Sequence, residues 1–314
     1  MGTGHQERTH GDSLMTHAST RISGLRSVSL CVPDLNLAED FFTRVWHLRV
    51  AARDDHGIYL SATGADHHVV SLHPEPGPAR LRDVTLRAHR ADLLQSVAQS
   101  ALDAGGQVLQ APGPVLEPGG GTAVTVADPE GRVFRVVHGD SLTLGPREEA
   151  DHPIRLAHVV LNACDVAAAQ KFMEQVFDFS LSDRTRIMAF MRCNSDHHSI
   201  ALADADNAAL NHIAFVMPSL DDVMRGGGRM KEAGYPIEWG PGRHGPGHNA
   251  FNYFVGPFDV VIEYTAEVQQ IDDSYRTGRP EDWTWPPGRV DHWGISTPPS
   301  ARLKQAQKSV LFKR

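Results

Sequence analysis

The segment LAHVVLNACDVAAAQKFM, residues 156–173, decides the fold, because the chain carries a second version of it at residues 25–42, LRSVSLCVPDLNLAEDFF. In both segments an apolar run of strand character is followed by an amphipathic helical pattern. Three more pairs of segments match in the same order, at the same offset of about 130 residues: ADHHVVSL (65–72) with SDHHSIAL (195–202), LRDVTLRA (81–88) with LNHIAFVM (210–217), and DPEGRVFRVV (128–137) with VGPFDVVIEY (255–264). The chain therefore consists of two similar halves.

Each half predicts the same series of elements: a strand, an amphipathic helix, several strands, a second helix, a glycine- and proline-rich turn, and two strands. The second helices are expected near residues 91–104 and 219–233. Such halves predict an α+β protein of two tandem domains. The expected divisions are a disordered leader (1–20), an N-terminal domain (21–140), a linker (141–152), a C-terminal domain (153–268) and a C-terminal tail (269–314).

Three polar residues stand inside apolar strands of the second half. His158 lies in LAHVVLN, His212 in LNHIAFVM and Glu263 in VVIEY. Because side chains alternate across a strand, each of them shares its face with apolar neighbours. Burying a carboxylate among Val and Ile is costly unless a cation pairs with it. Two histidines and one carboxylate form the facial-triad set that suits non-haem Fe(II) and leaves positions open for ligands.

A single histidine in a strand is more often a core or surface residue than a metal ligand. The first half supplies a comparison, because it keeps the strand pattern without the ligand set. Ser27 is opposite His158, Asp83 is opposite His212, and Arg135 is opposite Glu263. If folding alone required the three polar residues, the first half would need them too. A site in the second half is the better explanation.

These motifs resemble the vicinal oxygen chelate superfamily, whose domains are built from paired βαβββ modules. The second half is similar to type I extradiol ring-cleaving dioxygenases of the catechol 2,3-dioxygenase kind, through RCNSDHHSIAL (192–202), LNHIAF (210–215) and GRHGPGHNAFNYFVGPFDVVIEY (242–264). The resemblance implies that Fe(II) is bound by His158, His212 and Glu263. The first half is similar to the metal-free structural domain of that family.

The same resemblance implies catalytic roles beside the metal for His198, His244 and Tyr253. His197 precedes His198, and we choose His198 because the family pattern places the functional residue just before Ser. Tyr253 is ten residues before Glu263, a spacing that fits two strands of a hairpin facing one cavity. On its own, Tyr253 would be interpreted as ordinary strand packing.

The overall composition excludes several classes of protein. The 314 residues carry a formal charge of −8 and no basic stripe, which argues against nucleic-acid binding. No apolar run approaches the roughly 18 residues of a membrane span, and the first 20 residues have no apolar core typical of a secretory signal. Three cysteines without CxxC spacing argue against a zinc ribbon and fit a cytoplasmic protein.

Other signals carry less weight. His138-Gly139-Asp140 matches the HxD start of another iron-binding triad, but its place at the end of the first half favours a boundary turn. Glycines and prolines predict a loop over residues 240–253, in which His248 is a weak candidate. Gly226-Gly227-Gly228 interrupt a helical pattern, and a bend or close helix packing would explain them. In the tail, Trp283, Trp285 and Trp293 favour an ordered strap over the second domain, with a lid on an aromatic pocket as the alternative.

The function expected from these features is Fe(II)-dependent extradiol cleavage of a catecholic ring, in which both atoms of O2 are inserted next to the vicinal diol. Mn(II) is an alternative metal. The expected partners are a catechol with one or two rings, O2 and further copies of the chain in a homo-oligomer. Two rivals are another metal enzyme of the superfamily, such as an isomerase or epimerase, and a non-enzymatic module that binds small molecules.

Overall fold

The structure is a computed structural model that describes residues 20–143 and 148–313. The predicted leader lies outside the described residues, except for Thr20, and so does part of the predicted linker. Within the described ranges, the order strand, helix and three strands occurs four times. Each half of the chain holds two of these βαβββ modules, so the predicted α+β fold of paired modules is confirmed.

The first half forms a mixed sheet in the order β2-β3-β4-β1-β5-β8-β7-β6, and β17 from the end of the chain joins it beside β5. Helix α1 continues as a short π-helix over Phe41–Val45. The bounds are β1 (Ile22–Val32), α1 (Leu35–Asp40), β2 (Arg49–Asp54), β3 (Gly57–Ser61), β4 (Val70–Pro74), β5 (Arg80–Ala88), α2 (Leu93–Asp103), β6 (Gln107–Pro114), β7 (Thr122–Ala127) and β8 (Val133–His138).

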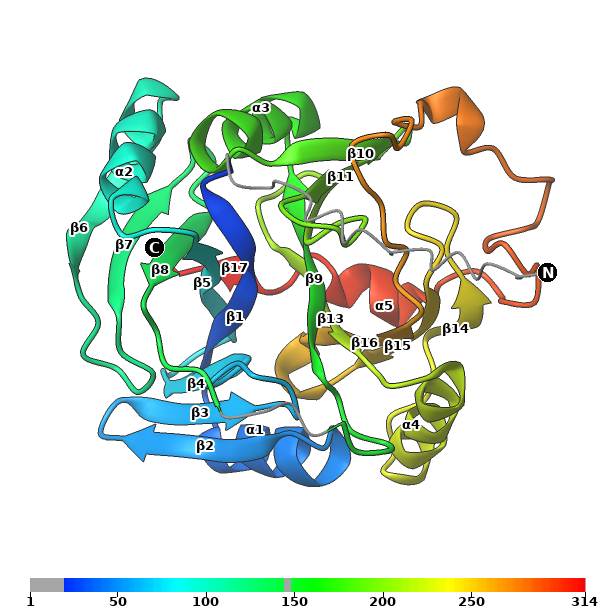
Figure 1. The fold of residues 1–314 in the computed structure, drawn as a ribbon. Coiled ribbons are helices and arrows are strands. Elements are labelled where there is room, and N and C mark those ends of the chain that lie inside the picture. The colour runs from blue at the N-terminus through cyan, green and yellow to red at the C-terminus, as the bar shows by residue number, and fades with distance from the viewer. Residues whose placement is uncertain (1–19, 144–147, 314) are drawn as a thin grey trace, which may run out of the picture.

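The second half repeats this arrangement in the order β10-β11-β12-β9-β13-β16-β15-β14. The halves lie side by side, with β1 and β9 next to each other between them (Figure 1). The bounds are β9 (Arg155–Ala163), α3 (Val166–Phe177), β10 (Ser180–Arg184), β11 (Met188–Arg192), β12 (Ile200–Asp204), β13 (Leu210–Val216), α4 (Leu220–Glu232), β14 (Trp239–Arg243), β15 (Ala250–Val255), β16 (Val261–Ala266), α5 (Ala301–Ala306) and β17 (Leu311–Phe312).

Two strands, β6 and β14, were not expected from the sequence. The predicted loop over residues 240–253 was wrong at its start, where β14 pairs with β15. Both strands lie at the edge of their sheets, where a proline that cannot donate a ladder hydrogen bond is tolerated. A register shift between Trp239 and Gly242 accommodates the irregular sequence.

The glycines of α4 are explained by close packing on the second sheet. A Cβ atom on Gly226 would lie 2.7 Å from the ring of Tyr264 in β16, and one on Gly227 would lie 3.0 Å from Asn252 in β15. A Cβ atom on Gly228 would contact nothing within 4 Å. Two of the three glycines therefore let the helix approach the strands that carry the candidate site.

An aromatic stack joins the two halves. The indole of Trp46, from the first half, lies parallel to the ring of Tyr264 with the centroids 3.6 Å apart, and both side chains are fully buried. The Tyr264 hydroxyl donates to the backbone carbonyl of Trp46 over 3.1 Å. Since Tyr264 follows Glu263 directly, this contact between the halves also fixes the strand that carries the carboxylate.

Candidate metal centre and active site

Three adjacent strands at the centre of the second sheet bring the predicted ligands together. Ala214 of β13 pairs with His158 of β9 on one side and with Glu263 of β16 on the other. His212 precedes Ala214 by two residues and therefore points to the same face of the sheet. The strand register itself thus places His158, His212 and Glu263 in one cluster.

The three side chains form a nearly equilateral triangle. His158 Nε2 and His212 Nε2 are 3.3 Å apart, and each lies 3.2 Å from Oε2 of Glu263. Hydrogen bonds cannot satisfy all three contacts at once when both rings are neutral. Donor atoms about 2.1 Å from an octahedral metal lie about 3.0 Å apart on one face. The triangle therefore fits a single divalent cation that leaves the opposite face open.

The electrostatics favour the ionisation states that metal ligands require. Burial alone would raise the pKa of Glu263, but the charges and hydrogen bonds of His158 and His212 hold that pKa well below its usual value. Burial lowers the pKa of His212 to about 4 against the opposing pull of Glu263. A carboxylate and a neutral imidazole are therefore present at neutral pH, and both bind metals in these forms.

Neighbouring amides orient two of these side chains. Asn211 Oδ1 lies 2.9 Å from Nδ1 of His212, so this ring donates through Nδ1 and presents the lone pair of Nε2. Asn249 Nδ2 lies 3.4 Å from Oε1 of Glu263 and donates to Thr265 over 2.7 Å. His158 Nδ1 is buried and has no hydrogen-bond partner among the described residues.

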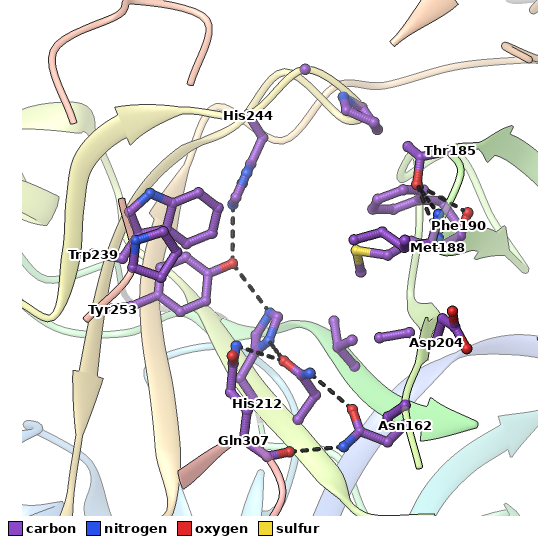
Figure 2. A pocket seen from close by; sticks show the side chains of 18 of the residues that line it. Asn162, Thr185, Met188, Phe190, Asp204, His212, Trp239, His244, Tyr253 and Gln307 are labelled. Atoms are coloured by element: carbon purple, nitrogen blue, oxygen red, sulfur yellow. Dashed lines mark hydrogen bonds between the residues drawn. The ribbon is translucent and has the colours of Figure 1, made fainter. Parts of the chain in front are cut away.

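The three residues expected to act beside the metal also surround the triangle. The Tyr253 hydroxyl lies 3.0 Å from Nε2 of His244 and 3.3 Å from Nε2 of His212, a row visible in Figure 2. The imidazole of His198 faces that of His158, with the ring centroids 4.3 Å apart. Their roles remain predictions, but all three line the same cavity as His158 and His212.

The two less favoured histidines lie elsewhere. His197 is fully buried behind His198 and does not line the cavity. His248 is exposed at the surface, 5.2 Å from the ring of His292. The HxD pattern is not a metal site, since Asp140 accepts charged hydrogen bonds from Arg87 at 2.9 and 2.8 Å and from Arg26 at 3.3 Å.

Burial also governs the pKa values of His198 and Tyr253. Burial, followed by the charge of His158, holds the pKa of His198 well below its usual value, so His198 is a neutral imidazole at physiological pH. Burial and the nearby Glu263 charge raise the pKa of Tyr253 well above its usual value. Tyr253 is therefore a neutral hydroxyl that can both donate and accept a hydrogen bond.

His158 and His212 line a cavity of about 900 Å³. Trp239 stands beside Tyr253 on one wall, while Met188 and Phe190 line the opposite wall (Figure 2). The C-terminal tail completes the enclosure with Trp283 and Trp285. Tail residues therefore line the aromatic cavity, as the alternative interpretation expected, and the strap over the second domain stays a prediction.

The equivalent place in the first half is filled by protein side chains. Thr85 of β5 pairs with Ser27 and with Arg135, the same register that Ala214 has in the second half. Arg135 is bound to Glu117 there, and the remaining cavity measures only about 10 Å³. Among residues 20–143 and 148–313, His158, His212 and Glu263 form the one group that could hold a metal.

The family model of the glyoxalase/bleomycin resistance protein/dioxygenase superfamily matches residues 24–136 and 155–264, one match for each half. The chain belongs to this superfamily. The two matched stretches span nearly all of the four βαβββ modules, whereas the tail with Trp283 and Trp285 lies outside both. The superfamily modules therefore supply the ligand strands, and the tail is an addition to them.

Several relatives share the superfamily modules. Metapyrocatechase 2 of Cupriavidus necator is 32% identical over 155 residues, 46% of each chain, so the chain spans about half the length of this curated relative. A manganese-dependent 2,3-dihydroxybiphenyl 1,2-dioxygenase of Geobacillus genomosp. 3 is 23% identical over 76% of this chain and 83% of its own. A Mn(II)-bound glyoxalase from Novosphingobium aromaticivorans is 33% identical, with a TM-score of 0.84 over 90% of this chain and 94% of its own.

Some residues of this superfamily site were missed by the sequence analysis. Asn211 and Asn249 lie inside the quoted motifs LNHIAF and GPGHNAF, so their proximity to a candidate ligand was a usable signal. Gln307 donates to Asn211 Oδ1 over 2.8 Å, but it follows α5, almost a hundred positions away. Nothing in the local sequence around Gln307 predicted that contact.

No described helix is long and apolar enough to cross a membrane.

Proposed function

We propose that the chain is a metal-dependent extradiol dioxygenase that cleaves a catecholic ring next to its vicinal diol. The observation that carries the proposal is the buried triangle of His158, His212 and Glu263 beside an aromatic cavity. Fe(II) is the proposed metal and Mn(II) the alternative, since two histidines and one carboxylate suit either ion. Such a metal would supply open positions for the two diol oxygens and for O2.

The side chains that surround the proposed metal site have separate roles in the proposed reaction. Tyr253 and His244 share a hydrogen bond of 3.0 Å and are placed to bind the diol oxygens and to take up a phenolic proton. His198 lies beside His158 and is placed to exchange a proton with the oxygen that reacts. A neutral imidazole can serve both as acid and as base in such a sequence.

The size of the cavity favours a substrate larger than catechol itself. About 900 Å³ lies near the upper end of the range of roughly 300–1,000 Å³ that accommodates drug-sized ligands. Trp239, Trp283 and Trp285 offer aromatic faces to a second ring. At the wall, Arg186 and Lys304 are exposed cations without an ion-pair partner among the described residues, which suits an anionic substituent. The proposed substrate is therefore a bicyclic or bulky catechol.

The second candidate is a metal-dependent isomerase, favoured by the likeness to the Mn(II)-bound glyoxalase over most of both chains. Such an enzyme would need the same triangle but no dioxygen. The dioxygenase is preferred because His198, His244 and Tyr253 surround the triangle and because two curated relatives are dioxygenases. A binding module without a reaction would not need a buried Glu263 between two histidines.

Oxygen consumption separates the two candidates. The protein is loaded anaerobically with Fe(II) and, separately, with Mn(II), and is offered catechol, 3-methylcatechol and 2,3-dihydroxybiphenyl with an oxygen electrode and a visible spectrum. We expect one O2 consumed per ring opened, with kcat/KM highest for 2,3-dihydroxybiphenyl. Absence of oxygen uptake with every catechol in a metal-loaded sample would sink the dioxygenase proposal. A higher kcat/KM for catechol than for 2,3-dihydroxybiphenyl would contradict the proposed bicyclic substrate but not the dioxygenase reaction.

A further inference from the structure

Behind His198 lies a buried row of polar groups that the proposed reaction does not use. His197 Nε2 is 2.6 Å from Oδ2 of Asp183, and His197 Nδ1 is 3.0 Å from Nδ1 of His198. Asp183 and His197 are both 0% exposed. Asp183 belongs to β10, and the two histidines immediately precede β12. The row therefore begins at a buried carboxylate and ends at the cavity wall, where His198 stands.

The direction of the hydrogen bonds in this row follows from an ionised Asp183 and a neutral His197. Asp183 also accepts from the backbone N–H of Gly278 over 2.7 Å and from the hydroxyl of Tyr275 over 3.1 Å, as expected of an ionised carboxylate. His197 must then donate through Nε2. In a neutral ring its Nδ1 is left as an acceptor, so the proton between the two imidazoles belongs to Nδ1 of His198.

This direction leaves Nε2 of His198 with a free lone pair. No described residue makes a hydrogen bond to that atom, and the His198 side chain lines the cavity. The nitrogen can accept a proton from the bound substrate. Once both nitrogens are protonated, the charge of Asp183 stabilises the imidazolium through His197, and the proton can be returned through Nε2.

The first half of the chain provides an internal comparison. His67 Nδ1 and His68 Nδ1 are also 3.0 Å apart, so the histidine pair belongs to the repeated fold. In the second half Asp183 pairs with Phe190, and at the equivalent place of the first half Ala52 pairs with Tyr59, in each case just after a register shift. The carboxylate therefore occurs beneath the histidine pair only in the half that holds the candidate metal ligands.

We infer that Asp183 and His197 are positioning residues that hold His198 as the Nδ1–H tautomer, with its proton-accepting Nε2 toward the substrate. The competing explanation is that Asp183 only attaches the tail, through Gly278 and Tyr275. That explanation does not require the bond to His197, and the first half shows that the pair persists without a carboxylate. The expected effect on kcat rests on the proposed function, whereas the Nδ1–H tautomer of His198 does not.

The substitution Asp183→Asn tests the inference with little change of shape. Because Gly278 donates to the Oδ1 side, the amide nitrogen takes the Oδ2 position and donates to His197. The row is then reversed, and His198 becomes the Nε2–H tautomer. We expect kcat to fall by a factor of about 10² to 10⁴, as when the carboxylate beneath a catalytic histidine is made an amide. Metal content should stay unchanged, and KM should change less than about threefold.

Two further variants separate positioning from attachment of the tail. Tyr275→Phe removes a hydrogen bond to the same carboxylate oxygen and keeps the ring that packs against His197, so kcat should stay within about twofold of the parent. Asp183→Ala introduces the residue that the first half has at the equivalent position, Ala52. This variant can replace Asp183→Asn in the test if the amide variant does not fold. It should lower kcat while metal content is retained.

Imidazole ¹⁵N chemical shifts of the zinc-substituted protein give a readout without turnover. We expect His198 as Nδ1–H in the parent and as Nε2–H in Asp183→Asn. An Nε2–H tautomer in the parent, or the same tautomer in both, overturns the inference even if ring cleavage is confirmed. Loss of kcat in proportion to lost metal, or an equal loss in Tyr275→Phe, also overturns it. If no catechol is cleaved, the ¹⁵N result alone decides the inference, so its failure and that of the proposed function are distinguishable.

Discussion

Glu263 is the residue on which the metal assignment depends most. It is fully buried and the one anion of the triangle, so Glu263→Ala should remove most of the metal from the purified protein. Elemental analysis after anaerobic loading with one equivalent of Fe(II) or Mn(II) measures this. Ser27→Ala, at the register position that corresponds to His158, is the matched control and should keep the parent metal content. Full metal retention in Glu263→Ala would show that the triangle is not the site.

His198 should behave differently from the ligands. Because it contacts His158 but is not part of the triangle, His198→Phe should keep the metal and the affinity for substrate. Ring cleavage should slow by a factor of about 10² to 10⁴, the usual contribution of general acid–base catalysis. Metal analysis together with kcat and KM tests this. A variant that loses its metal would make His198 a ligand or a support of one.

The sequence reveals functional candidates when a residue's polarity does not fit the apolar residues around it. A carboxylate or histidine in an apolar strand stands out, so His158, His212 and Glu263 could be selected from the pattern alone. Asp183 and Gln307 could not be selected, because their partners are reached only through the tertiary fold. Strand pairing makes Arg135 the counterpart of Glu263, because Thr85 pairs with Arg135 as Ala214 pairs with Glu263.

In helix α4, the effects of alanine at two glycines, Gly226 and Gly228, can be compared. Gly226→Ala would place a Cβ atom 2.7 Å from the Tyr264 ring and should destabilise the protein by about 1–3 kcal/mol. A Cβ atom in Gly228→Ala would have no neighbour within 4 Å. This substitution should stabilise the protein by up to about 1 kcal/mol, because alanine loses less backbone entropy than glycine when the helix folds. Urea unfolding of both variants measures the difference. Equal effects of the two substitutions would contradict the packing explanation.

The elements themselves were predictable where the hydrophobic period was strong. The strands β9, β13 and β16 and the helices α2 and α4 follow from such patterns, and their ends differ from the expected ones by a few residues. The edge strands β6 and β14 were missed, because prolines and glycines hide the alternation and only the pairing with a neighbour holds them extended.

For the molecule as a whole, the metal should contribute measurably to stability. Ion binding to the folded state alone adds about 2.7 kcal/mol when the free ion is at a hundred times its dissociation constant. Dialysis against a chelator should therefore lower the Tm, and readdition of the metal should restore it. Glu263→Ala is the control, since its Tm should not respond to the ion. An identical Tm with and without metal in the parent protein would contradict this prediction.

The short strand β17 has a consequence for the biosynthesis of the protein. Leu311 pairs with Arg80 in the first sheet, although 231 positions separate them (311 − 80), and the neighbouring Val310 carbonyl accepts from Leu210 in the second. A ribosome completes the first domain long before these residues emerge, and domains generally begin to fold as they are made. The backbone carbonyl of Leu81 therefore gains its partner, the N–H of Lys313, only after synthesis has passed that residue. Addition of β17 to the first sheet is therefore a late step of folding.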